Sequence, residues 1–181
     1  MKGFKSASRH RDTDSGGVAW IWKQDLNVVA ELENHLKDHS NERCWIKIKS
    51  SSGTIALAAA YLPVEGSNET GRENFRKILQ ILDKDTNTLE QEKSSYIYGD
   101  FNAHIGTPAN DPLGIKGNKP KVGENGQDLI TWLRNNNRVT GNGLNLTKGL
   151  WTYQNTKGSK SVLDLMIINK RYNPSKRGNY R

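Results

Sequence analysis

An aspartate and an asparagine two residues apart are the side chains in this sequence best suited to chemistry. Asp100 and Asn102 follow the run Ser95 to Tyr98, whose aromatic and β-branched residues predict a short strand. Because residues i and i+2 of a strand point the same way, we expect both side chains to leave its end together. Their oxygen atoms suit a hydrated Mg²⁺ and an attacking water. The alternative is an Asx turn, in which both side chains bond the local backbone.

Asp164 is the second candidate, because its neighbours are apolar. The sequence predicts a carboxylate within an apolar strand, surrounded by Val162, Leu163, Leu165, Met166, Ile167 and Ile168. A charge in such a setting needs a partner or a functional purpose. Pairing with a buried lysine or arginine is the structural alternative.

Four basic or titratable side chains after Asn102 are candidates for phosphate contact. His104 follows Asn102 by two residues and either contacts phosphate or bonds the backbone of the turn. Lys116, Lys119 and Lys121 lie in a Gly-, Pro-, Asn- and Lys-rich stretch, residues 106–123, that predicts a long exposed loop. These lysines either follow a DNA backbone or are solvated.

Strands and two helices would hold these residues in place. Apolar alternation and β-branched content predict strands over Gly17 to Lys23, Cys44 to Lys49, Thr54 to Tyr61, Trp151 to Gln154 and Val162 to Ile168. The second and third form a hairpin through Ser50 to Gly53, and the third is apolar enough to be central in its sheet. The stretch Val28 to Lys37 fits either a helix or a strand.

Two amphipathic patterns predict helices. The first runs from about Gly71 to Asp85 behind a capping box at Thr70, with an apolar stripe formed by Phe75, Ile78, Leu79 and Leu82. The second runs over about 126–135, capped by Asn125, with Leu129, Ile130 and Leu133 facing inward. Alternating strands and helices of this kind predict α/β or α+β layering.

Four short motifs in order resemble the endonuclease/exonuclease/phosphatase superfamily. They are Gly-Asp-Phe-Asn-Ala-His at 99–104, Gly-Gly-Val-Ala at 16–19, Tyr-Leu-Pro at 61–63, and Trp-Thr-Tyr at 151–153 followed by an aspartate-bearing apolar strand over 161–167. The resemblance covers about 16–168. It is closest to the endonuclease domain of LINE-type (non-LTR) retrotransposons, in which Gly-Asp-Phe-Asn-Ala-His is the usual spelling.

The resemblance implies a fold and an activity. The fold would be two packed β-sheets flanked by helices, an incomplete four-layer sandwich, and the activity a Mg²⁺- or Mn²⁺-dependent DNA endonuclease. Asp100 would contact the metal and help to activate water, and Asn102 would orient that water or the phosphate oxygens. Tyr61 would bond the scissile phosphate, and Asp164 would hold a catalytic histidine.

The sequence departs from the family at both ends. The family's glutamate-bearing strand precedes its Gly-Gly-Val-Ala strand, whereas residues 1–15 here contain no Glu, and no Asp-His pair follows Asp164. We therefore expect a domain truncated at both ends, with impaired activity. The alternatives are a non-catalytic, basic nucleic-acid-binding remnant and a phosphatase acting on a small phosphorylated substrate.

Composition narrows the class of partner. The chain of 181 residues has 27 Lys and Arg against 19 Asp and Glu, a net charge of +8, and predicts one domain with a polyanionic partner such as DNA. An inert basic surface is the alternative. We expect a basic tail or loop over 1–15, the partial domain over 16–168 and a basic tail over 169–181. Cys44 is the single cysteine, and it predicts a buried thiol in a reducing, intracellular compartment. That compartment would be the nucleus if DNA is the substrate. No apolar run reaches membrane-spanning length.

Overall fold

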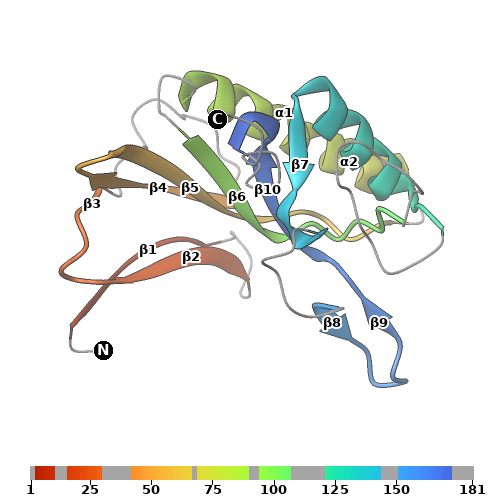
Figure 1. Ribbon diagram of the computed structural model, residues 1–181. Helices are drawn as coiled ribbons and strands as arrows, with labels where there is room; N and C mark the ends of the chain where they lie inside the picture. The colour runs from red at the N-terminus through yellow and green to blue at the C-terminus, as the bar shows by residue number, and fades with distance from the viewer. Residues whose placement is uncertain are drawn as a thin grey trace.

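The computed structural model describes residues 3–10, 16–29, 42–66, 69–89, 94–106, 121–143 and 151–172. Its centre is a six-stranded mixed sheet (Figure 1). The strands, in spatial order, are β3 (Val28–Val29), β4 (Arg43–Ser50), β5 (Gly53–Tyr61), β6 (Ser94–Asp100), β10 (Asp164–Asn169) and β7 (Arg138–Thr140). Strands β5 and β6 pair in parallel, and the other neighbours are antiparallel.

One face of this sheet is covered by helices and the other by a second sheet (Figure 1). The helices are α1 (Glu69–Leu89) and α2 (Glu124–Asn135). The second sheet is the antiparallel pair β1 (Phe4–His10) and β2 (Gly17–Lys23), which contacts β4 and β5. The predicted class is confirmed: an α/β protein with two packed sheets and helices on the outer face of the larger one.

Trp20 joins the two sheets. Its indole nitrogen donates a hydrogen bond to the carbonyl oxygen of Cys44 on β4, at 3.0 Å, and its ring meets Tyr98 of β6 edge-on, with centroids 6.0 Å apart. Tyr98 therefore points to the face on which β2 packs. Cys44 is buried, as predicted.

The assignment of residues 1–15 as a loop or tail is wrong for Phe4–His10, which form β1. The polar sequence of this strand has no apolar periodicity. The strand forms because each of its seven residues pairs with β2, from Phe4 opposite Lys23 to His10 opposite Gly17. The pairing with the following strand gives no signal within the sequence of Phe4–His10 itself.

The core lies between the six-stranded sheet and the two helices. Alternate residues of β5 are buried, and the apolar stripes predicted for both helices are buried as well: Ala56, Ala58, Ala60, Phe75, Ile78, Leu79, Leu82, Leu129, Ile130 and Leu133. The β4–β5 hairpin has the predicted turn, with Ser50 opposite Gly53, and β5 is interior to the sheet.

Both helices begin earlier than predicted. Helix α1 starts at Glu69, so Thr70 lies inside it and is not its cap, and α1 continues past Asp85 to Leu89, which is also buried. Helix α2 is preceded by Gly123 as its cap residue, so Asn125 belongs to its first turn and does not cap it. In the described part of the chain, neither helix is long and apolar enough to cross a membrane.

Three short elements complete the described structure. They are the 3-10 turns η1 (Gly141–Gly143) and η2 (Lys170–Tyr172), and a small hairpin of β8 (Tyr153–Gln154) and β9 (Lys160–Ser161). The hairpin projects away from the six-stranded sheet (Figure 1). The predicted strands at 151–154 and 162–168 correspond to β8 and β10, each of which begins two residues later than predicted, and β9 was not predicted.

Candidate active site

Three of the predicted site residues lie in one row across neighbouring strands. Asp100 is the last residue of β6; Tyr61, the last residue of β5, is opposite it on one side, and Asp164, the first residue of β10, on the other. Directly paired residues of a sheet present their side chains on the same face. That face is the one away from the helices, because Tyr98, two residues before Asp100, points toward Trp20 of β2.

Gly99 makes this row possible. Its φ is +153°, and a Cβ at this position would overlap the backbone of Ala60 on β5. Only glycine allows the ends of β5 and β6 to approach so closely. The glycine of the Gly-Asp-Phe-Asn motif thus has a steric role, which is to bring Asp100 alongside Tyr61.

Asp100 is half-buried and bonded within its own loop. Its Oδ1 accepts a hydrogen bond from the backbone N–H of Asn102 at 2.9 Å, which is the Asx turn considered as the alternative from sequence. Burial raises the pKa of the Asp100 carboxyl above its ordinary value, and the charge of Asp164 raises it further, against the opposing effect of the Asn102 hydrogen bond. Two carboxylates directly opposite each other on neighbouring strands make a site that a cation would stabilise.

The sequence predicted that Asn102 and Asp100 leave the end of the strand pointing the same way. The structure shows that they do not. Strand β6 ends at Asp100, and Asn102 has a left-handed backbone with φ of +44°. Its Nδ2 donates to the carbonyl oxygen of Leu62 at 2.8 Å. Its Oδ1 accepts no hydrogen bond from the described residues, so this oxygen can accept one from water.

Asp164 is exposed, which corrects the expectation of a carboxylate within an apolar setting. The error came from treating its apolar neighbours as surroundings. In a strand they alternate, so Leu165 and Ile167 point into the core and Asp164 points the other way.

Two residues that sequence reasoning gave no role hold the backbone around Asp164. The Thr152 hydroxyl oxygen accepts the N–H groups of Leu163 and Asp164, both at 3.0 Å. Asn142 donates from Nδ2 to the carbonyl oxygen of Asp164 and accepts the N–H of Met166, both at 2.8 Å. Thr152 lies in a quoted motif, but Asn142 has no sequence signal beyond the flanking glycines.

The predicted phosphate contacts are placed only in part. The backbone carbonyl of His104 accepts the N–H of Gly123 at 2.9 Å. This bond does not involve the side chain, so a phosphate contact and a side-chain bond to the turn both stay predictions. Lys121 is exposed just before α2, whereas Lys116 and Lys119 lie outside the described residues.

Trp151 is exposed, with 44% of its surface accessible. The ammonium group of Lys160 lies 3.5 Å from the centroid of its ring. Tyr153 is also exposed. The projecting hairpin therefore presents aromatic and cationic side chains together.

No protein-family model and no curated protein sequence matches the chain. Solved structures do match. The endonuclease domain of TRAS1, a telomere-specific non-LTR retrotransposon, aligns with a TM-score of 0.65 and 17% identity over 94% of this chain and 69% of that chain. This protein has the endonuclease/exonuclease/phosphatase fold.

Two further structures share the endonuclease/exonuclease/phosphatase fold. The catalytic domain of Xenopus laevis APE2 aligns with a TM-score of 0.60 and 13% identity, over 94% of this chain and 68% of that chain. A 3′ phosphatase, NExo from Neisseria, bound to a product DNA hairpin, aligns with a TM-score of 0.54 and 13% identity, over 93% and 68%. The resemblance drawn from four short motifs is thus confirmed for the fold.

A divalent cation fits the residues of this candidate site in a limited way. The described residues contain no group of three or more Asp, Glu, His or Cys side chains that could hold a metal. Mg²⁺, however, keeps several waters and is commonly bound through one or two carboxylates together with substrate phosphates. Asp100, with Asp164 beside it, meets that smaller requirement.

Proposed function

We propose that this chain is a Mg²⁺-dependent (or Mn²⁺-dependent) phosphodiesterase that nicks DNA slowly, related to the endonuclease domains of retroelements. The observation that carries the proposal is the row formed by Tyr61, Asp100 and Asp164 at adjoining strand ends. The row combines a phenol with two carboxylates, and burial, together with the charge of Asp164, raises the pKa of Asp100.

The residues of the row divide the work among them. Asp100 would hold the cation, and Asp164 would add negative charge beside it. Asn102 accepts a hydrogen bond from the attacking water through Oδ1, which aims the water, and the Tyr61 hydroxyl donates to a phosphate oxygen. When bound, the cation polarises the phosphodiester and offsets the charge that develops on it. Water then attacks phosphorus in line and loses a proton to solvent, and the bond from phosphorus to the leaving oxygen breaks as that oxygen takes up a proton from solvent.

The substrate in this proposal is DNA. Support comes from the net charge of +8, since basic proteins bind polyanions. Both the association rate and the affinity of such binding fall as the salt concentration rises. The hairpin with Trp151, Tyr153 and Lys160 adds a surface on which aromatic rings and an ammonium group could meet bases and phosphates. A nuclear location follows from this substrate and is part of the proposal.

A second candidate is a DNA-binding module without turnover. The absence of a larger ligand group among the described residues favours it, because such a site binds Mg²⁺ weakly. Activity therefore has to be measured with a sensitive substrate and long incubations.

Conversion of supercoiled plasmid to the nicked form separates the two candidates. The proposal predicts slow nicking in Mg²⁺ that stops in EDTA and in Asp100→Ala. The matched control is Asp25→Ala, which removes an exposed aspartate from the turn between β2 and β3. Plasmid binding without nicking supports the module, and release of phosphate from inositol phosphates without nicking supports a small-molecule phosphatase.

A further inference from the structure

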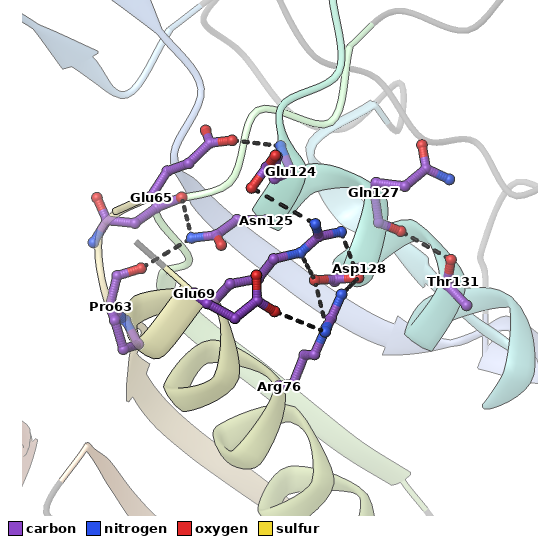
Figure 2. Close-up of polar contacts among 11 residues, drawn as sticks. Pro63, Glu65, Glu69, Arg76, Glu124, Asn125, Gln127, Asp128 and Thr131 are labelled. Atoms are coloured by element: carbon purple, nitrogen blue, oxygen red, sulfur yellow. Dashed lines mark hydrogen bonds and ion pairs between the residues drawn. The ribbon is translucent and has the colours of Figure 1, made fainter. Parts of the chain in front are cut away.

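The first turn of α2 holds two loops that leave the candidate active site. One loop, Leu62–Gly66, follows Tyr61, and the other, 101–106, follows Asp100. Asn125 lies between them with only 1% of its surface exposed. Its Nδ2 donates to the carbonyl oxygen of Pro63 at 3.1 Å and to that of Asn102 at 3.3 Å, so one amide group joins both loops. Figure 2 shows the bond from Asn125 to Pro63.

The neighbours of Asn125 pack the same turn against the same loops. The N–H of Gly123 donates to the carbonyl oxygen of His104 at 2.9 Å. A Cβ at Gly126 would overlap that same carbonyl oxygen, so the loop and the helix are in direct backbone contact there. On the other side, the Glu65 carboxylate accepts the N–H of Glu124, which satisfies a free donor of the helix (Figure 2).

Helix α2 is in turn fixed to α1. The guanidinium groups of Arg72 and Arg76 donate from Nε to Asp128 Oδ2 at 2.9 and 3.0 Å. Figure 2 shows Arg76 also meeting Glu69 of its own helix, at 3.8 Å. The turn that carries Asn125 is therefore part of a helix pair joined by ion pairs. The two loops bonded to this turn are fixed relative to that helix pair.

We propose that Asn125 is a positioning residue, whose amide sets the loop after Tyr61 and the loop after Asp100 in a fixed relation to one another. The proposal rests on the proposed function for its catalytic consequence. The position of Asn102 depends on the link most directly, because Asn125 bonds its carbonyl while Asn102 itself bonds Leu62. Without the link, the positions of the water-orienting Asn102 Oδ1 and of the Tyr61 hydroxyl would vary independently of each other.

The chemistry of the site explains why asparagine stands here. Two carbonyl oxygens need two donors on one atom, which a carboxamide nitrogen supplies. Aspartate has the same shape but only acceptors when ionised, and it would face two carbonyl oxygens without donating to either. Asn125→Asp and Asn125→Ala therefore remove the link in different ways.

Amide hydrogen exchange tests the link without reference to activity. In both variants the amides of Leu62 and Asn102 should exchange tenfold or more faster than in the native chain, relative to amides in the middle of β5. The control is Asn136→Ala. It removes an asparagine that donates to the carbonyl of Trp132 at the other end of α2, and should leave the Leu62 and Asn102 amides unchanged. Equal exchange at Leu62 and Asn102 in the native chain and both Asn125 variants would overturn the proposal.

Nicking kinetics test the catalytic consequence. Both Asn125 variants should lower kcat by tenfold or more, with KM for plasmid within twofold of the native value, and Asn136→Ala should change neither. A rise in KM alone, or unchanged kcat, would refute a positioning role even where exchange confirms the link. If the native chain does not nick, the proposed function fails, and the exchange result alone decides whether Asn125 joins the loops.

Discussion

Asp100 and Asp164 are paired directly across the antiparallel strands β6 and β10, with their side chains on one face of the sheet. Like charges opposite one another destabilise a strand pair. The sheet nevertheless places a carboxylate at each position, and the pKa of the Asp100 carboxyl is raised, first by burial and then by the charge of Asp164. A costly charge pair with an adjacent tyrosine is the arrangement expected of a site that binds a cation.

Removing one member of this pair should stabilise the protein in the absence of metal. Asp164→Asn keeps the size of the side chain and the backbone bonds to Thr152 and Asn142 while removing the repulsion. We expect a gain of about 0.5 kcal/mol at pH 7, or a rise in Tm of about 1–2 °C, measured by thermal unfolding in EDTA. Asp25→Asn is the control and should change Tm little. A fall in Tm for Asp164→Asn would show that the pair is not repulsive.

The same shift predicts a pH dependence. Because folding raises the pKa of Asp100, the folded chain holds this proton more tightly than the unfolded chain. The contribution favours folding fully below the ordinary pKa of aspartate and is lost as the pH rises through the folded pKa. The free energy of unfolding of Asp100→Asn should therefore rise relative to that of the native chain as the pH rises from acid to neutral. Urea unfolding at a series of pH values measures this difference. A constant difference across that range would contradict the shift.

A buried ion pair makes the largest stability prediction. Asp85 of α1 accepts hydrogen bonds from the Arg43 guanidinium and, at 2.9 Å, from the indole of Trp45, both on β4. Both charged side chains are about 95% buried, with 5% and 3% exposed. Asp85→Ala removes this buried carboxylate partner of Arg43 and should cost about 3–5 kcal/mol, measured by urea unfolding. Lys84→Ala, at an exposed neighbour, should change the free energy of unfolding by less than about 0.5 kcal/mol.

The β8–β9 hairpin makes a prediction about binding. Lys160→Gln removes a cation that lies over Trp151, and should weaken binding to any duplex DNA sequence. If Lys160 neutralises one phosphate, the slope of log affinity against log salt should fall by about 0.9. Fluorescence anisotropy at several salt concentrations measures it, with exposed Lys84→Gln as the control. An unchanged slope would place the hairpin outside the DNA interface.

Local patterns predicted what local forces determine. The β4–β5 hairpin, the apolar stripes of α1 and α2, and the buried Cys44 each follow from the periodicity of adjacent residues. The row of Tyr61, Asp100 and Asp164 could be anticipated only as three strand ends. Their register across β5, β6 and β10, and the close approach at Gly99, are properties of the folded sheet that a sequence does not display.

The errors arose where distant segments decide the outcome. Phe4–His10 is a strand because β2 lies beside it. Asn125 has the residue type of a helix cap. In the fold its amide instead donates to the carbonyl oxygens of Pro63 and Asn102, which lie in two different loops. Asp164 is exposed because alternation along β10 separates it from its apolar neighbours, which the period of a strand already implies. The first two cases, by contrast, required the fold to be known.

Paramagnetic broadening by Mn²⁺ tests the central claim, that the row of Tyr61, Asp100 and Asp164 binds a divalent cation, without depending on turnover. In amide spectra recorded with substoichiometric Mn²⁺, signals of these three residues and of Asn102 should broaden first. Mg²⁺ in excess should restore them, and Asp100→Asn should abolish the selective effect. Broadening centred on another part of the chain, or spread evenly over its acidic surface, would contradict the account.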